Sequence, residues 1–305
     1  MQNYLLLLAG IACAAIGGEL FVQGAVDIAR WARVSPGIIA VTVAAFATSS
    51  PELSVSISSA VAGTPEIALG DALGSNVVNV ALILGIALAL SGIRSPRDSI
   101  RRDFPVALAV PLVTAVLVAD GEISRLEGAA LLAGFVGWLI MAIREAWHQR
   151  RIAVDEGAPT HRVRTVMAIG AGLALLIAAG TPIVAGARGV AQSYGLPEFV
   201  IGATVVAVGT SVPELATTIM AKLRGHDEVS LGTILGSNLF NGLFIVAVAA
   251  MIHPIAVART GVLIALAFGL VAVALTFTGR DGTIGRARGV LLLLLYVAYL
   301  AAVLS

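Results

Sequence analysis

Two stretches of the sequence, Ala47–Glu52 (ATSSPE) and Gly209–Glu214 (GTSVPE), carry the same pattern Thr-Ser-x-Pro-Glu in the two halves of the chain. Each Pro lacks a backbone N–H, so the carbonyl four residues earlier loses its helical partner and the turn is distorted. Each Glu directly follows the Pro and lies well inside a long apolar segment. The pattern indicates two interrupted helices, each of which presents a carboxylate beside exposed carbonyls.

The two stretches belong to a longer internal repeat. Residues 39–85 align without a gap to residues 201–247, with 20 identities in 47 positions. The identities include a second pair of motifs, Gly74–Asn79 (GSNVVN) and Gly236–Asn241 (GSNLFN). In each motif the Ser and the last Asn are four residues apart and therefore share one helix face. We expect the leading Gly of each motif to let a neighbouring backbone approach closely.

The composition is that of a protein whose solvent is lipid. Hydrophobic residues make up 58% of the 305 positions and charged residues 12%, and the mean hydropathy is +0.98. Soluble domains carry about 25% charged residues. The net charge of +1 disfavours a nucleic-acid partner. Because backbone groups in lipid must bond internally, long apolar runs predict helices and hence an all-α membrane protein.

Ten apolar segments are long enough to span a bilayer, which takes about 20 residues. They are Tyr4–Ala29, Pro36–Val61, Pro65–Leu90, Phe104–Ala119, Leu126–Ala146, Val166–Ala187, Pro197–Ala221, Val229–Ile252, Val257–Phe277 and Gly289–Leu304.

The basic residues support this count. Of the 19 Lys and Arg residues, 16 fall in the segments that follow odd-numbered spans. Cytoplasmic loops carry the Lys/Arg excess, so we predict a cell (inner) membrane protein with both termini on the external, periplasmic side. The predicted organisation is a five-span half over 1–147, a cytoplasmic linker over 148–163 and a second half over 164–305. Five is odd, so the second half is inverted, and inverted repeats are typical of secondary transporters with a midplane site.

Paired carboxylates inside the membrane indicate a cation site. A charge at the bilayer centre costs about 2.5–3.5 kcal/mol or more, and here Glu52 and Glu214 incur that cost twice. Carboxylates, hydroxyls and released carbonyls form an all-oxygen ligand set, which suits hard cations. The alternative is that each Pro only kinks its helix and each Glu bonds a neighbouring hydroxyl. The symmetry of the two copies favours the cation site.

Two further acidic residues leave alternatives open. Asp71 lies one turn before Ser75, and its counterpart in the second half is Thr233. It either attracts cations into an external vestibule or bonds locally near the outer end of its span. Glu19 lies deep in the first span and either pairs with a helix end or lines the pathway.

The two doubled motifs resemble the alpha-repeats of the cation/calcium exchanger superfamily, and specifically its sodium/calcium exchanger branch. The resemblance implies a central set of four cation sites. It further implies that spans one and six slide across the remaining bundle to alternate access. The metal-binding positions that it implies are Ala45 and Thr48 (backbone carbonyls), Ser49, Glu52, Ser75, Asn79, Ala207 and Thr210 (carbonyls), Ser211, Glu214, Ser237 and Asn241.

The resemblance also implies the activity. We expect exchange of Ca²⁺ for Na⁺, electrogenic and independent of potassium, because Asn241 stands where potassium-dependent members carry Asp. A proton/calcium antiporter is the alternative; a channel would need no counter-ion. An intramembrane metalloenzyme is a further alternative, but the sequence contains no His-Glu-x-x-His motif of the kind that such an enzyme would carry. We expect no cofactor, and Ca²⁺, Na⁺ and membrane lipid as partners, with no obligatory protein partner.

Overall fold

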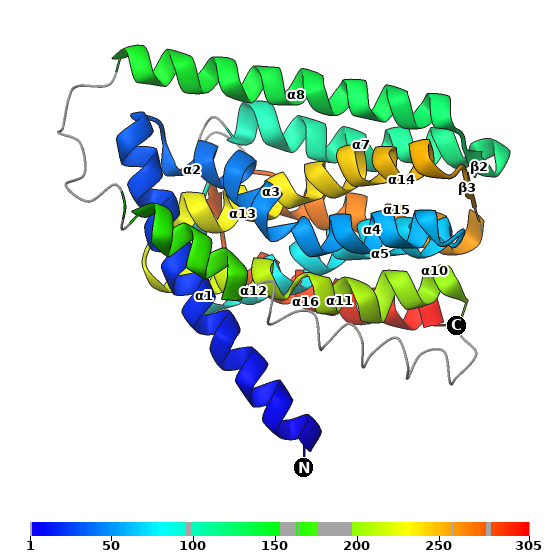
Figure 1. Ribbon diagram of the computed structural model, residues 1–305, viewed down its shortest axis with the longest axis horizontal. Coiled ribbons are helices and arrows are strands. Elements are labelled where there is room, and N and C mark those ends of the chain that lie inside the picture. The colour runs from blue at the N-terminus through cyan, green and yellow to red at the C-terminus, as the bar shows by residue number, and fades with distance from the viewer. Residues whose placement is uncertain are drawn as a thin grey trace.

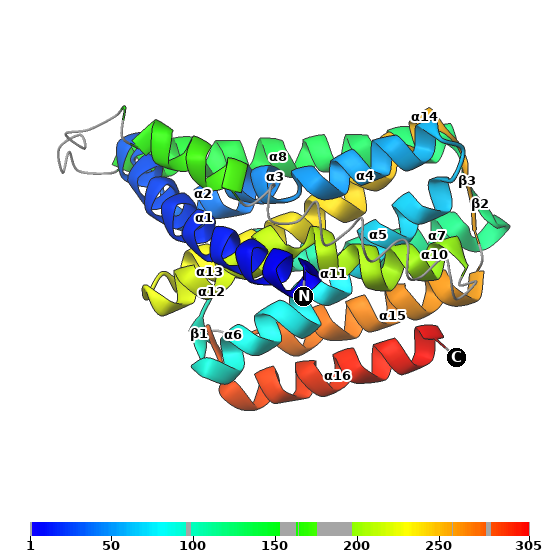
Figure 2. The ribbon, with the colours of Figure 1, turned by 60° about the horizontal axis from the view of Figure 1, so that its bottom comes forward.

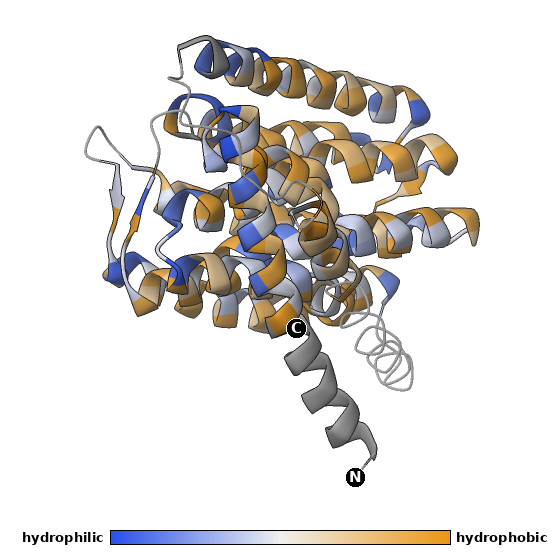
Figure 3. Ribbon diagram, turned by 60° about the vertical axis from the view of Figure 1, so that its left-hand side comes forward, coloured by the Kyte–Doolittle hydropathy of each residue, from blue (hydrophilic) through white to orange (hydrophobic). Residues whose placement is uncertain are grey.

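The computed structural model describes residues 2–95, 99–152, 163, 165–175, 197–257, 259–278 and 282–304. These residues form helices joined by short connections, with four two-residue strands at the ends of the bundle (Figure 1). The helices are hydrophobic over most of their length, and much of the hydrophilic sequence lies at their ends (Figure 3). This distribution is that of a bundle surrounded by lipid.

The first helices of the chain form a reversal. Helix α1 covers Gln2–Ala32, and the chain then turns by 118° into the helical stretch Pro36–Thr48. Arg33 takes a positive φ of 59° at this turn. Ser35 caps the next helix by accepting a hydrogen bond from the N–H of Ile38, and Pro36 occupies the first turn, where its missing N–H costs nothing.

Two blocks of elements follow the same order in the two halves of the chain. The first block runs α2 (Pro36–Ile39), π-helix η1 (Ala40–Ala44), α3 (Ala45–Thr48), α4 (Ser50–Val61) and α5 (Pro65–Val77). The second runs α10 (Glu198–Ile201), π-helix η5 (Gly202–Val206), α11 (Ala207–Thr210), α12 (Val212–Leu223) and α13 (Asp227–Leu239).

The blocks share one register. When Thr48 is aligned with Thr210, every boundary in the second block coincides with its counterpart in the first. The stretches α2 to α4 and α10 to α12 cross the molecule in opposite directions in both views (Figures 1 and 2).

Two long helices occupy the centre of the bundle. Helix α5 continues through η2 (Val78–Leu84) into α6 (Gly85–Leu90), and α13 continues through η6 (Phe240–Ile245) into α14 (Val246–Ile252). In their most apolar windows, 72% and 83% of the residues are buried. The corresponding shares for the spans built on α7, α8, α15 and α16 are 28–33%. The central helices therefore pack against protein, whereas the other four present apolar side chains to lipid.

The peripheral helices flank this centre. Helix α7 (Phe104–Leu117) follows η3 (Ser99–Asp103) and leads through η4 (Val118–Asp120) towards α8 (Arg125–Ile152). Helices α15 (Arg259–Thr276) and α16 (Arg286–Leu304) lie side by side on another flank (Figure 2).

Glycines allow α5 to pack closely against η5 of the second block, and α13 to pack closely against η1 of the first block. A Cβ on Gly74 would lie 2.5 Å from the Cα of Ala203 in η5, and one on Gly236 would lie 2.8 Å from the carbonyl carbon of Val41 in η1. Real Cβ atoms do not approach a backbone this closely. The predicted role of Gly74 and Gly236 in close backbone packing is confirmed.

Two short strand pairs tie the connections together at opposite ends of the bundle (Figure 2). Strand β1 (Ile93–Arg94) pairs with β4 (Thr283–Ile284), and β2 (Glu122–Ile123) pairs with β3 (Ile255–Ala256), both antiparallel. The first pair joins the connections after predicted spans three and nine, and the second joins those after spans four and eight. Each pair thus unites connections that the predicted alternation places on one side of the membrane.

Within the described residues, six helices are long and apolar enough to cross a membrane, and eight if each of two bent pairs counts as one span. The described part of every predicted span is mainly helical, apart from the breaks at Ser49 and Ser211 and the terminal residues Pro197, Val257 and Phe277. The predicted sixth span begins as the helix Thr165–Leu175, and its remainder lies outside the described residues. The predicted linker begins as helix, because α8 continues to Ile152, and residues 153–162 lie outside the description.

Candidate cation site

Each repeat has a break where the sequence places Thr-Ser-x-Pro-Glu. Ser49 has φ −82° and ψ 11°, and Ser211 has φ −80° and ψ 10°, so both leave the α-helical region in the same way. The axes on either side of Ser211 differ by 44°. Pro follows two residues later in each copy and lacks the N–H that would continue the ladder. The local sequence therefore produces the break, and a π-helix precedes it in both repeats.

Across the molecule, each break faces the carboxylate of the opposite repeat. The Ser49 hydroxyl donates to Glu214 Oε1 at 3.1 Å, and the Ser211 hydroxyl donates to Glu52 Oε1 at 3.4 Å. The Ser237 hydroxyl also donates to Glu214 Oε1, at 3.0 Å. The reciprocal contacts show that the two halves of the site are related as the two repeats are.

Threonine and serine hydroxyls form two further contacts between the repeats. Thr48 lies 3.5 Å from Ser237, and Ser75 lies 3.4 Å from Thr210, oxygen to oxygen. Each Thr hydroxyl also approaches a carbonyl of its own helix: Thr48 reaches that of Ala45 at 3.4 Å, and Thr210 that of Ala207 at 3.3 Å. Hydroxyls, carbonyls and carboxylates of both repeats thus meet in one place.

The carboxylates retain oxygen atoms without a hydrogen-bond partner. Glu52 Oε2 and Glu214 Oε2 are buried with no donor, and so are the side-chain oxygens of Asn79 and Asn241. Buried polar atoms are normally satisfied, because an unsatisfied one costs about 1–3 kcal/mol and more if charged. These four atoms are oxygens, which are the atoms that a hard cation binds.

All twelve residues proposed as ligands are at most 1% exposed. Hydrogen bonds between side chains join Thr48, Ser49, Glu52, Ser75, Thr210, Ser211, Glu214 and Ser237 across the two repeats. Asn79 is instead bonded to Asn238. Among the described residues no group of three or more His, Cys, Asp or Glu side chains could hold a metal. The arrangement is a mixed set of two carboxylates with neutral oxygens, closed to solvent in this conformation.

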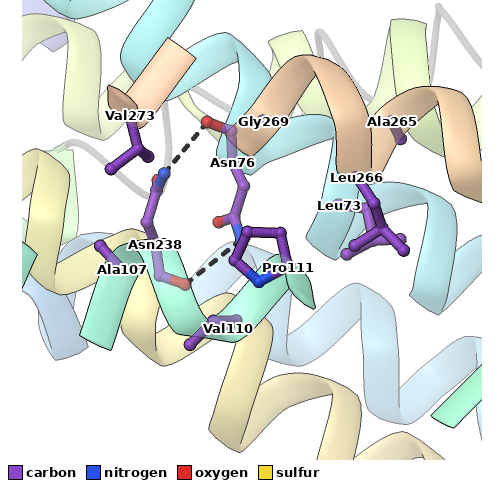
Figure 4. A pocket seen from close by; sticks show the side chains of 10 residues that line it. All are labelled: Leu73, Asn76, Ala107, Val110, Pro111, Asn238, Ala265, Leu266, Gly269 and Val273. Atoms are coloured by element: carbon purple, nitrogen blue, oxygen red, sulfur yellow. Dashed lines mark hydrogen bonds between the residues drawn. The ribbon is translucent and has the colours of Figure 1, made fainter. Parts of the chain in front are cut away.

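Asn76 and Asn238 lie within the two repeated motifs, at positions that the sequence did not predict to be functional, and form a pair beside the site. The Asn76 amide donates to the backbone carbonyl of Asn238 at 3.2 Å, and the Asn238 amide donates to that of Asn76 at 3.1 Å (Figure 4). Asn238 Oδ1 also accepts from Asn79 at 3.1 Å. The pair joins α5 to α13 next to a cavity of about 20 Å³, which has room for about one water. Its recurrence in both repeats was the signal that could have revealed it.

The contacts of Glu19 and Asp71 bear on the alternatives that the sequence leaves open for them. Glu19 forms an ion pair with Arg224, the residue that caps the end of α12, so it pairs with a helix end. Asp71 is fully buried in this conformation. Its Oδ1 accepts from Thr210 at 3.0 Å and from Ser75 at 3.5 Å, which places it beside the site.

Removing the serines at the breaks is expected to weaken cation binding without unfolding the protein. Ser49→Ala and Ser211→Ala each remove a hydrogen bond to a carboxylate, worth about 1.5–3 kcal/mol, so the apparent Ca²⁺ affinity should fall by about tenfold or more. Ser50→Ala is the control, because its hydroxyl donates to the Phe46 carbonyl of its own helix. Half-saturation of ⁴⁵Ca²⁺ uptake measures the effect. Equal affinities for Ser49→Ala and Ser50→Ala would contradict it.

The chain is similar to known transporters over most of its length. The family model described as sodium/calcium exchanger protein matches residues 2–144 and 165–305. The chain belongs to the sodium/calcium exchanger family. Membership makes this exchanger a membrane protein and a cation/calcium antiporter rather than an enzyme.

Individual relatives agree with the family. The putative antiporter CaxA of Alkalimonas amylolytica is 34% identical over 96% of both chains. The sodium/calcium exchanger MaX1 of Methanosarcina acetivorans is 29% identical over 98% of this exchanger and 97% of the relative. The sodium-calcium exchanger NCX_Mj, in a structure soaked with 2.5 mM Na⁺ and 10 mM Sr²⁺, superposes with a TM-score of 0.84 at 28% identity and covers 99% and 98% of the two chains.

Proposed function

We propose that this exchanger moves Ca²⁺ in one direction and Na⁺ in the other through a single site that alternates between the two sides of the membrane. The observation that carries the proposal is the crossed contact of Ser49 with Glu214 and of Ser211 with Glu52, in which each carboxylate keeps a buried, unpartnered oxygen. A site of this kind must hold a cation or remain unsatisfied. The twelve predicted ligand positions are the proposed lining.

The charge of the site bears on its cargo. Glu52 and Glu214 give a charge of −2, which one Ca²⁺ or two Na⁺ would neutralise. The stoichiometry that we propose, three Na⁺ for one Ca²⁺, is the one that the family resemblance implies. It moves one net charge per cycle, which is worth about 2.3 kcal/mol per 100 mV, so the proposed exchange is electrogenic. Asn241 adds no charge at its position, in keeping with independence from potassium.

The proposed membrane topology is ten helices in two inverted five-helix halves, with residues 148–163 as a cytoplasmic linker and both termini outside. The reversed course of α10 to α12 relative to α2 to α4 supports the inversion (Figure 1). The strand pairs support the alternation, because each joins connections of one predicted side. The Lys/Arg excess of one set of connections supports the orientation in a cell membrane.

Two helices, α1 and Thr165–Leu175, are proposed to slide across the rest of the bundle when access to the site alternates. Small residues line their contacts: a Cβ on Gly18 would lie 3.0 Å from the backbone of Ala216 in α12, and one on Gly172 would lie 2.8 Å from the carbonyl of Gly17. Smooth contacts between small residues suit sliding of one helix layer over another. The ion pair of Glu19 with Arg224 fixes α1 to the end of α12 in this conformation.

The counter-ion is tested with the purified protein in proteoliposomes. Vesicles loaded with Na⁺ are expected to accumulate ⁴⁵Ca²⁺ on dilution into Na⁺-free buffer. A potential that is positive inside should speed this uptake, because the exit of three Na⁺ for each Ca²⁺ that enters carries one net positive charge outwards. Vesicles with a pH gradient and no Na⁺ test the alternative, a proton/calcium antiporter. Uptake driven by the pH gradient alone, with no response to Na⁺, would overturn the proposed coupling.

A further inference from the structure

A third buried carboxylate, Asp71, lies beside the site, and the two-carboxylate scheme does not use it. Asp71 lies on α5, four residues before Ser75 and therefore about 6 Å from it along the helix axis. Its Oδ1 accepts from Thr210 at 3.0 Å and from Ser75 at 3.5 Å. Both hydroxyls belong to residues of the proposed lining. Asp71 is thus bonded directly to the ligand set and is fully buried with it.

Asp71 and Glu52 are linked through adjacent residues of the second repeat, because Thr210 donates to Asp71 and Ser211 donates to Glu52. Glu52 Oε1 accepts from the Ser211 hydroxyl at 3.4 Å, and its Oε2 is buried without a partner. Two acidic groups and the hydroxyls between them therefore form one end of the site, defined by Glu52, Asp71, Ser75 and Thr210.

The opposite end of the site has a neutral residue in place of the third acid. The residue related to Asp71 by the repeat is Thr233, which is buried. The remaining members of that end, Glu214, Ser237 and Thr48, correspond one for one to Glu52, Ser75 and Thr210. The two ends therefore correspond residue for residue and differ in charge by one unit when Asp71 is ionised.

We propose that Asp71 is a specificity-determining residue that strengthens the binding of a monovalent cation at the end of the site formed by Glu52, Asp71, Ser75 and Thr210. Oxygen donors of these four residues suit Na⁺, and the added negative charge favours cations at this end over the Thr233 end. With Asp71 ionised the three carboxylates carry −3, so one bound Ca²⁺ would leave a charge of −1, which one monovalent cation would neutralise. The inference rests on the proposed function and deepens it.

Asp71→Asn tests the proposal with little change of shape. The amide oxygen still accepts from Thr210 and Ser75, so a purely structural role is retained while the charge is lost. We expect the Na⁺ concentration for half-maximal Ca²⁺ exchange to rise by about tenfold, equivalent to about 1.4 kcal/mol, with a lower Hill slope. Half-saturation by Ca²⁺ should change by less than about threefold. Na⁺-dependent thermal stabilisation of the purified protein, against choline chloride, should weaken in parallel.

Matched variants and the wild type separate the possible results. Glu198→Gln removes a charge at an exposed position in the first turn of α10, outside the proposed lining, and should leave Na⁺ half-saturation within about threefold. Asp71→Thr, which installs the side chain that the second repeat already accommodates, serves if Asp71→Asn does not fold. An unchanged Na⁺ dependence, or equal losses for Na⁺ and Ca²⁺, would overturn the role of Asp71. A wild-type protein without Na⁺-driven exchange would instead overturn the proposed function.

Discussion

Glu52→Gln and Glu214→Gln are each expected to abolish Ca²⁺ exchange. Each change removes one of the two carboxylates that the crossed serine contacts bring together, and it leaves the shape of the side chain intact. Loss of one member of a buried charged pair costs about 2–5 kcal/mol, or about 30- to several thousand-fold in binding of the cation. Initial rates of ⁴⁵Ca²⁺ uptake into Na⁺-loaded proteoliposomes measure the loss.

The loss of uptake can be assigned to the carboxylates only if the Glu52→Gln and Glu214→Gln variants still fold. The glutamine oxygen can still accept from Ser49, Ser211 or Ser237, so both variants should elute as the wild type does in size-exclusion chromatography. Glu198→Gln is the matched control, because Glu198 lies in the first turn of α10 and is exposed. It should exchange at the wild-type rate. Normal uptake by both site variants would refute the assignment of the carboxylates.

The repeat could be predicted from the sequence in detail, because it is written in residue identities. The register that aligns the two motifs also aligns the boundaries of the elements from α2 to α5 with those from α10 to α13. The breaks follow from Pro51 and Pro213, whose missing N–H groups act locally. Gly74 and Gly236 could be assigned to close packing because no other residue permits it. These features depend on local chemistry, which the sequence records directly.

The positions of Glu19 and Asp71 could not be predicted, because they depend on neighbours distant in the chain. The position of a residue along an apolar run predicts its depth in the membrane only if the helix is straight and perpendicular to the bilayer. It does not predict which residues of a neighbouring helix the side chain contacts. The partner of Glu19 is Arg224, which comes from the end of α12 in the other half of the chain. Asp71 is buried because η5 packs onto α5, where a Cβ on Gly202 would lie 2.9 Å from the Asp71 nitrogen.

Helix packing at the glycines also determines whether the site exists at all. Gly236 lies one residue before Ser237, and a Cβ there would lie 2.6 Å from the Cβ of Ala45 and would overlap the carbonyl of Val41. Neither obstacle is the flexible end of a side chain. A side chain at this position must therefore push η1 and α3 away from α13, and with them the Thr48 and Ser49 hydroxyls that face Ser237 and Glu214.

Gly236→Val is accordingly expected to prevent recovery of a monodisperse protein, and Gly236→Ala to lower its stability. Overpacking of this kind costs about 1–3 kcal/mol for small additions and more for larger ones. Gly137→Ala in α8 is the control: nothing lies within 4 Å of the added methyl group, so it should be neutral or stabilise by up to about 1 kcal/mol. Thermal unfolding in detergent, followed by tryptophan fluorescence, compares the variants. If Gly236→Ala unfolds at the same temperature as Gly137→Ala and exchanges Ca²⁺ normally, the prediction is wrong and α13 does not pack against η1 as closely as described.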